Sequence, residues 1–275
     1  MVNKSIGTLE LNKIHNTDCL IGLAELPDNC VDLTVTSPPY DDLRNYHGHS
    51  FDFEQVAKEL FRVTKEGGVV VWVVGDKVHK GSETGTSFKQ ALFFMEQGFN
   101  LHDTMLYEKD SISFPEKTRY YQIFEYMFVF SKGKPKTVNL LSDRKNKCFN
   151  GKKHIKGRFR TVDGEQVEHR KQNLLKEYGV RFNIWRIPNG HQKSTLDSIA
   201  YKHPAIFPEK LANDHILSWS KEKDVILDPF MGSGTTAKMA SLNNRDWIGF
   251  EIAKEYVDIA NVRLNSINEK PRQLS

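Results

Sequence analysis

Hydrophobic and polar positions along this chain of 275 residues follow two spacings in turn. Val69–Val74 is an unbroken apolar run, rich in β-branched residues, that follows two glycines, and this pattern is typical of a buried strand. Before it, Phe53, Val56, Leu60 and Val63 recur at the three- and four-residue steps of an amphipathic helix. The chain therefore begins with alternating strand and helix signals.

The same alternation continues to the end of the chain. Further strands are predicted over Val31–Thr36, Leu101–Leu106, Tyr126–Phe130, Val225–Leu227 and Trp247–Phe250. Helices are predicted over Phe53–Thr64, Ser87–Gln97, Ile206–Ser218, Thr235–Asn243 and Lys254–Asn265. Apolar strands that alternate with helices predict an α/β fold with a mostly parallel sheet and helices on both faces.

Composition narrows the class of protein. The chain is 39% hydrophobic and 27% charged, which is ordinary for a globular protein. Its length allows one large α/β domain, or one domain with a small insert. The apolar run Val69–Val74 is far too short to span a membrane, and the first residues lack an apolar signal segment. The cysteines Cys19, Cys30 and Cys148 have no paired spacing, so we expect a cytosolic enzyme without disulfides or a metal site.

The formal net charge of +4 conceals an uneven distribution. Residues 132–186 contain 16 lysines and arginines and 5 acidic residues, so this segment carries +11 and the rest of the chain −7. Such a surface neutralises phosphates, with Phe149, Phe159, Phe182 and Trp185 available to stack on bases. The alternative is a solvated insert without a ligand.

A glycine loop follows the predicted strand Val225–Leu227 and opens the next helix. Gly232, Gly234 and Ala237 fit the spacing G-x-G-x-x-A, and glycines there let the backbone approach a ligand. Glu251 lies 19 residues after Gly232, where a carboxylate can accept hydrogen bonds from ribose hydroxyls. The loop predicts a nucleoside cofactor, although a tight turn without a ligand has the same local pattern.

The residue after the strand distinguishes between cofactors. Asp228 is a carboxylate that would repel a pyrophosphate and attract an ammonium group. The chain ends 24 residues after Glu251, too soon for the remaining strands of a dinucleotide-binding half-sheet in the usual order. These features favour S-adenosylmethionine, which has both an amino group and a ribose, over a dinucleotide.

A second motif, Thr36-Ser37-Pro38-Pro39-Tyr40, ends the predicted strand Val31–Thr36. Two prolines cannot continue a hydrogen-bonded ladder, so they form a rigid extended turn with free carbonyl acceptors. With the Ser37 hydroxyl before them and the Tyr40 ring after them, such a turn can hold a planar amine. Packing of the prolines against Tyr40, without a ligand, is the alternative interpretation.

Together, Asp228–Thr236 and Thr36–Tyr40 closely resemble the DNA amino-methyltransferases, which methylate N4 of cytosine or N6 of adenine. The catalytic motif comes first, a variable target-recognition region follows, and the cofactor motif comes last, which is the order of the family's β group. The resemblance extends over roughly Lys13–Leu264. It implies a Rossmann-like methyltransferase sheet with a circularly permuted motif order and a basic target-recognition insert.

The resemblance also implies roles for individual residues. Ser37, Pro38, Pro39 and Tyr40 would be catalytic: the Ser37 hydroxyl and the Pro38 carbonyl accept the N–H groups of the target amine, and Tyr40 stacks on the flipped base. S-adenosyl-L-methionine would be bound by Asp18, Cys19, Asp228, Phe230, Gly232, Ser233, Gly234, Thr235 and Glu251. No cysteine lies beside the Pro-Pro turn, so covalent cysteine chemistry is disfavoured.

The segments of the chain then divide by role. We expect 1–131 and 201–275 to form the catalytic and cofactor-binding halves of one domain, and 132–200 to recognise the target in double-stranded DNA. Its candidate DNA-binding residues are Lys145, Lys147, Lys152, Lys153, Lys156, Arg158 and Arg160. Serine before Pro-Pro-Tyr favours N4 of cytosine, with N6 of adenine as the alternative. A cytoplasmic enzyme of bacterial or phage origin is expected, monomeric or homodimeric, with a restriction endonuclease as an optional partner.

Overall fold

Two compact units make up the chain. The computed structural model describes residues 4–39, 52–112, 115, 117–147, 149, 154–155, 158–168, 173–174 and 176–269. Unit 1 comprises Met1–Asn139 and Asn183–Ser275, and unit 2 comprises Leu140–Phe182. Unit 2 therefore lies inside the segment 132–200, while 132–139 and 183–200 belong to unit 1.

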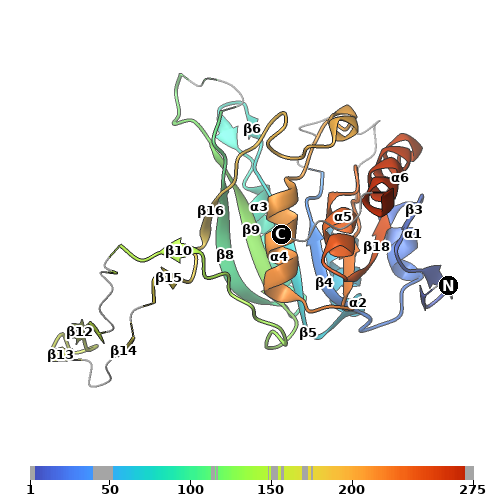
Figure 1. Ribbon diagram of the computed structural model, residues 1–275. Coiled ribbons are helices and arrows are strands. Elements are labelled where there is room, and N and C mark those ends of the chain that lie inside the picture. The colour runs from blue at the N-terminus through green and yellow to red at the C-terminus, as the bar shows by residue number, and fades with distance from the viewer. Residues whose placement is uncertain are drawn as a thin grey trace. The chain divides into compact units, whose positions relative to one another are not determined.

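An eight-stranded sheet forms the centre of unit 1 within the described residues (Figure 1). The strands from one edge to the other are β16 (Ile184–Arg186), β8 (Asn100–Glu108), β9 (Phe124–Ser131), β5 (Thr64–Val74), β4 (Val31–Thr36), β17 (Val225–Asp228), β18 (Asp246–Phe250) and β3 (Lys13–His15). Only β9 runs antiparallel to its neighbours among these strands. The predicted mostly parallel sheet is confirmed.

Helices cover the sheet in two groups. On one face lie α1 (Cys19–Ala24), α2 (Phe53–Val63) and α3 (Thr86–Glu96), and on the other lie α4 (Glu209–Trp219), α5 (Thr235–Leu242) and α6 (Lys254–Glu269). Consecutive residues of each strand point to opposite faces. Trp72 of β5 accordingly donates from Nε1 to Oε1 of Gln90 in α3, at 2.9 Å. Met127 of β9 faces the other way, with its sulfur 3.2 Å from Nε2 of His215 in α4.

Two sequence-based expectations need correction. The helix predicted from Ile206 begins at Glu209, because Pro208 is its N-cap and takes an extended conformation. Trp185 is not available to stack on bases: it lies in β16, is 5% exposed, and stacks on the His215 ring at 4.5 Å between centroids. The short strand β16 escaped the sequence analysis because its three residues carry no periodicity.

The remaining elements are small. Unit 1 also contains the hairpins β1 (Ser5–Ile6) with β2 (Leu9–Glu10) and β6 (Val78–His79) with β7 (Ser82–Glu83), and the 3-10 helix η1 (Ser198–Lys202). Unit 2 consists of the antiparallel pairs β10 (Arg144–Lys145) with β15 (Tyr178–Gly179), β11 (His154–Ile155) with β14 (Asn173–Leu174), and β12 (Arg158–Arg160) with β13 (Gln166–Glu168). None of the helices described here has the length and apolar composition needed to cross a membrane.

Candidate active site

The connections that follow β4 and β17 leave the sheet in opposite directions. β4 continues through α2 to β5 on one side, whereas β17 continues through α5 to β18 on the other. In open parallel sheets, ligands bind in the crevice at the carboxyl ends of such a pair of strands. A cavity of about 690 Å³ lies there, within the usual range for small-molecule sites.

This cavity gathers most of the predicted site residues from distant parts of the sequence. Its walls include Asp18, Cys19, Ser37, Pro38, Pro39, Asp228, Phe230, Ser233, Thr235 and Glu251. Gly232 and Gly234 belong to the same loop, between and beside these lining residues. Tyr40 lies outside the described residues.

Asp228 ends β17 and is buried, with 5% of its surface exposed. Its Oδ1 accepts hydrogen bonds from the Thr36 hydroxyl at 2.6 Å and from the Phe230 amide at 3.0 Å. Burial raises the pKa of Asp228 to about 6, although hydrogen bonds from Thr36, Thr236 and the Phe230 amide oppose the shift. A cationic ligand beside this carboxylate would favour its ionised form.

The loop after Asp228 uses two glycines in the left-handed region. Gly232 has φ +50° and Gly234 has φ +80°, conformations that side chains disfavour. A Cβ atom on Gly234 would lie 2.7 Å from the Cβ atom of Ala260 in α6. The loop therefore approaches α6 more closely than any other residue type at position 234 would allow.

Glu251 follows β18 and is bonded to the glycine loop. Its Oε2 accepts from the Gly232 amide at 2.8 Å, and its Oε1 accepts from the Ala253 amide at 2.9 Å. The Glu251 amide itself donates to the carbonyl of His15 in β3 at 3.1 Å. These bonds fix a carboxylate at the cavity wall, where each oxygen has a second lone pair with which to accept hydrogen bonds.

Asp18 and Cys19 lie where α1 begins. Oδ1 of Asp18 accepts from the Leu20 amide at 2.8 Å and caps the helix. Burial raises the pKa of Cys19 to about 12 and that of Cys30 to about 11, so both thiols stay protonated at neutral pH. Cys148 lies outside the described residues. Neither described cysteine has the lowered pKa of an activated nucleophile.

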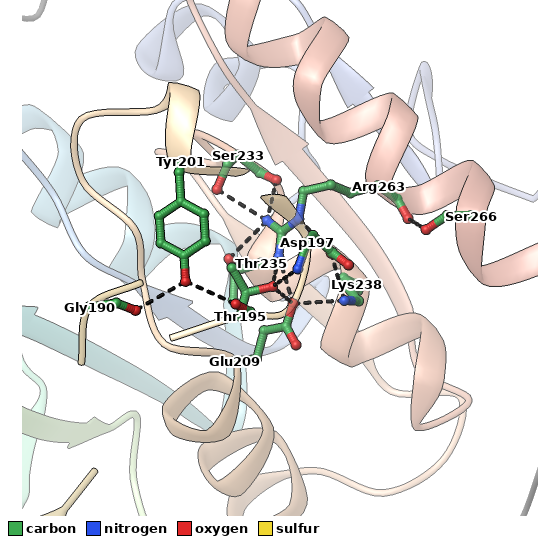
Figure 2. A network of polar contacts seen from close by, with 10 residues as sticks. All are labelled: Gly190, Thr195, Asp197, Tyr201, Glu209, Ser233, Thr235, Lys238, Arg263 and Ser266. Atoms are coloured by element: carbon green, nitrogen blue, oxygen red, sulfur yellow. Dashed lines mark hydrogen bonds and ion pairs between the residues drawn. The ribbon is translucent and has the colours of Figure 1, made fainter. Parts of the chain in front are cut away.

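Sequence analysis missed a buried arginine that supports the glycine loop (Figure 2). Arg263 of α6 is 1% exposed. Its Nη1 donates to the Ser233 carbonyl at 2.5 Å and to the Thr235 hydroxyl at 3.1 Å. Its Nε and Nη2 donate to Asp197 at 2.9 Å and to Glu209 at 2.7 Å. One side chain thus joins the glycine loop to the segment that precedes α4.

Lys238 of α5 closes this network, with Nζ 2.7 Å from carboxylate oxygens of both Asp197 and Glu209. Two cations and two anions then alternate in a ring. Nearby, the Tyr201 hydroxyl donates to the Gly190 and Thr195 carbonyls at 3.0 and 2.9 Å. Because Gly190 and Tyr201 line the cavity, the network holds two of its walls.

A second group of polar residues lines the cavity at the ends of β5, β8 and β9. Asp76 follows β5 and accepts from the Ser87 amide at 2.9 Å. Nζ of Lys109 lies 2.6 Å from Oε1 of Glu125. The Tyr107 hydroxyl is buried and has no hydrogen-bond partner within the described part of the chain. In the order of the sheet, these strands lie on the opposite side of β4 from the glycine loop.

The predicted DNA-binding residues belong to unit 2. Lys145 is exposed in β10, Lys147 is exposed just after it, and Arg158 and Arg160 are exposed in β12. Lys152, Lys153 and Lys156 lie outside the described residues. The Arg144 guanidinium lies 4.4 Å from the centre of the exposed Phe182 ring.

Comparison with known proteins identifies relatives across most of the chain. It is 79% identical over 239 residues to the orphan methyltransferase M.BamHII of Bacillus amyloliquefaciens, covering 87% of this chain and 90% of that protein. Its fold matches that of the PvuII cytosine-N4-specific DNA methyltransferase with a TM-score of 0.67, at 21% identity over 95% of this chain and 87% of that one.

A DNA modification methylase of Thermus thermophilus, solved in complex with S-adenosyl-L-methionine, matches with a TM-score of 0.62 at 23% identity. That match covers 92% of this chain and 93% of the Thermus protein. Residues 31–262 match the sequence profile of the N6/N4 Mtase family, which is described as DNA methylase. The chain therefore belongs to the N6/N4 family of S-adenosylmethionine-dependent DNA methyltransferases.

Proposed function

We propose that this protein transfers a methyl group from S-adenosyl-L-methionine to the exocyclic N4 of a flipped cytosine in a specific sequence of double-stranded DNA. The observation that carries the proposal is the hydrogen bond between Thr36 and Asp228. It joins the ends of β4 and β17, so the Ser37-Pro38-Pro39 turn and the glycine loop line one cavity. An amine bound at the turn is thereby adjacent to a cofactor bound at the loop.

The residues of the loop fit S-adenosyl-L-methionine. The buried Asp228 carboxylate is suited to its ammonium group, and Glu251 to its ribose hydroxyls. Asp18, by resemblance to the family, accepts a hydrogen bond from the adenine amine. The small residues Gly232 and Gly234 leave the loop backbone open to a ligand. When bound, the cofactor supplies an electrophilic methyl group next to the Pro-Pro turn.

The Pro-Pro turn prepares the target amine. An exocyclic amine on an aromatic base is a poor nucleophile because its lone pair is delocalised into the ring. Acceptance of its two N–H groups by the Ser37 hydroxyl and the Pro38 carbonyl favours a pyramidal nitrogen with a more localised lone pair. Both acceptors are held by β4 before the reaction begins, so little reorganisation is needed. Tyr40 is proposed to stack on the extruded base.

Cytosine is proposed as the target because Ser37 precedes Pro-Pro-Tyr, as in family members that modify N4. Adenine N6 is the alternative, since the same acceptors serve any planar exocyclic amine. The basic unit 2 is proposed to recognise DNA, within a target-recognition region at 132–200 that separates the catalytic and cofactor-binding halves. The order of the motifs places the chain in the circularly permuted β group.

A dedicated restriction endonuclease is not required by this proposal. M.BamHII, which is highly similar to the chain, is named as an orphan methyltransferase. This supports a solitary enzyme that acts without a cognate nuclease.

Transfer of radiolabelled methyl groups to DNA tests the proposal. The purified protein and S-adenosyl-L-methionine with a tritiated methyl group are incubated with mixed-sequence DNA, and label is counted in the DNA. We expect label from the wild-type protein and about 100-fold less from Ser37→Ala, because one acceptor of the amine is lost. Unlabelled DNA with the wild-type protein would refute the function, while full labelling by Ser37→Ala would refute only the role of Ser37.

A further inference from the structure

Two connections lie beside the part of the cavity that is furthest from the glycine loop. One is the hairpin β6–β7, in which Val78 lines the cavity. The other connects β8 to β9, and its residue Gln122 lines the cavity, as does Phe124 at the start of β9. Both connections therefore belong to the rim through which a target base would enter.

This rim is tied together by polar contacts. Nη2 of Arg119, in the β8–β9 connection, donates to the carbonyl of Gly81 at the tip of the β6–β7 hairpin. The Arg119 guanidinium also lies 4.0 Å from the Glu83 carboxylate. At the other end of the β8–β9 connection, Lys193 forms a 2.7 Å ion pair with Asp110. The connection is thus anchored on both sides of its described residues.

Next to the anchored Arg119 stands a fully exposed aromatic ring. Tyr120 is 101% exposed, and Tyr121 beside it is 50% exposed. Tyrosine normally buries much of its ring, so a free ring between an anchored arginine and the cavity-lining Gln122 requires an explanation. No apolar neighbour shields it within the described residues, and a planar partner is the chemistry that such a ring accepts best.

The charges around the ring fit DNA. Lys77 and Lys80 lie in and beside the β6–β7 hairpin, and Lys117 precedes Arg119. The nearby acidic groups Glu83 and Asp110 are paired with Arg119 and Lys193. Cations at this rim can contact the phosphates on either side of the target nucleotide.

We propose that Tyr120 inserts into the DNA duplex and stacks in the space vacated by the target base. This inference rests on the proposed function, because only a base-flipping enzyme leaves such a space. Extrusion unstacks two neighbouring base pairs and leaves the opposite base without a partner. An aromatic ring in the gap restores stacking on both sides and opposes return of the base, as apolar wedges do in other DNA-distorting proteins.

The test compares two duplexes that contain the methylated sequence, mapped beforehand by sequencing DNA treated with the wild-type protein. In one duplex the target base is normally paired, and in the other it faces an abasic site, where extrusion costs less. Single-turnover methylation is measured for wild type, Tyr120→Ala and Tyr120→Phe. Leu242→Ala, at an exposed residue at the end of α5, is the matched control.

We expect Tyr120→Ala to slow methylation of the paired duplex by about 10- to 100-fold, because base–aromatic stacking is lost. The same variant should act on the abasic duplex within about threefold of the wild-type rate. Tyr120→Phe and Leu242→Ala should match wild type on both duplexes, and binding of S-adenosylhomocysteine should be unchanged in all four proteins. Thermal unfolding checks that each variant is folded.

Three outcomes would overturn the inference. Tyr120→Ala with wild-type rates on the paired duplex would exclude a stacking role. An equal loss on both duplexes would indicate a general DNA contact, and a loss in Tyr120→Phe would indicate a hydroxyl contact, for instance to a phosphate. If the wild-type protein methylates neither duplex nor mixed-sequence DNA, the proposed function fails, and the inference about Tyr120 fails with it.

Discussion

The Thr36 hydroxyl donates a 2.6 Å hydrogen bond to Oδ1 of Asp228, although the two residues are 192 positions apart in the sequence. Both are buried, at the carboxyl ends of the neighbouring strands β4 and β17. The residue after Thr36 is the proposed amine acceptor Ser37, and the loop after Asp228 is the proposed cofactor loop. This one contact therefore sets the register between the two halves of the proposed reaction.

The first prediction concerns the pH dependence of cofactor binding. Burial raises the pKa of Asp228 to about 6, and binding of an ammonium group favours the ionised carboxylate. The dissociation constant of S-adenosyl-L-methionine should therefore rise as the pH falls through 6, by about tenfold for each pH unit below it. Calorimetry between pH 5 and pH 7.5 measures this. In Asp228→Asn we expect weaker binding without that pH dependence; the same dependence in that variant would refute the assignment.

The unliganded protein should respond to pH in the opposite direction. The folded-state pKa of Asp228 lies above the ordinary value of 3.8, so the folded state binds the proton more tightly than the unfolded state does. Its contribution to stability is fully present below pH 3.8 and is lost as the pH rises through 6. Comparison of wild type with Asp228→Asn by chemical unfolding at several pH values separates this contribution from those of other groups.

Asp18 has two separable roles. Its Oδ1 caps α1, and by resemblance its carboxylate also binds the cofactor adenine. Asp18→Ala should lose both roles, with a cost of about 1 kcal/mol in unfolding free energy and cofactor binding that is weaker by about tenfold or more. Asp18→Ser should retain the cap, and hence the stability, but not the tight binding. Thermal unfolding and calorimetry distinguish the two variants, and unchanged binding in both would remove Asp18 from the cofactor site.

Arg263 should affect both stability and cofactor binding. Arg263→Met leaves Asp197 and Glu209 with Lys238 as their remaining cation in the network and frees the Ser233 carbonyl. Loss of one partner of such a buried ion network costs about 3–5 kcal/mol. We expect S-adenosyl-L-methionine to bind less tightly as well, because the glycine loop loses its support.

Arg245 offers a matched control for this variant. It is a partly buried arginine whose guanidinium bonds Ser220 and Asn243, near the opposite end of α5 from the glycine loop. Arg245→Met should lower the melting temperature without changing the cofactor dissociation constant. If Arg263→Met also leaves that constant unchanged, Arg263 contributes only to stability.

The role of unit 2 can be tested by the salt dependence of DNA binding. Each phosphate contact by a lysine or arginine contributes about −0.9 to the slope of log K against log salt for duplex DNA. Replacement of Lys145, Lys147, Arg158 and Arg160 by serine should therefore make the slope less steep, by up to about 3.6. Lys13→Ser, at an exposed lysine of β3, is the control and should leave the slope unchanged. An unchanged slope in the fourfold variant would indicate that DNA binds elsewhere.

Local patterns allowed much of the fold to be predicted. The strand expected over Val31–Thr36 is β4 with the same bounds, because alternating apolar residues end at a Pro-Pro turn. The expected strand Val69–Val74 lies within β5, which begins earlier, at Thr64. The polar residues of that first part, such as Lys65, carry no strand signal of their own, and their pairing with neighbouring strands decides their structure.

The candidate site was predictable where a residue lies in a short motif at the end of a strand. Ser37, Asp228 and Glu251 are of this kind, and all three line the cavity. Arg263 and Tyr120 are not. Arg263 lies in an ordinary amphipathic helix, and its partners are 28 to 68 positions away in the sequence. The exposure of Tyr120 depends on the path of the whole β8–β9 connection, which no local pattern specifies.

Analysis of methylated nucleosides tests the central claim most directly. Mixed-sequence DNA is treated with the protein and S-adenosyl-L-methionine, digested to nucleosides and analysed by mass spectrometry. We expect N4-methylcytosine as the product, formed by wild type and largely absent with Ser37→Ala. N6-methyladenine as the product would contradict the choice of cytosine, and unmodified nucleosides would contradict amine methylation of DNA by this protein.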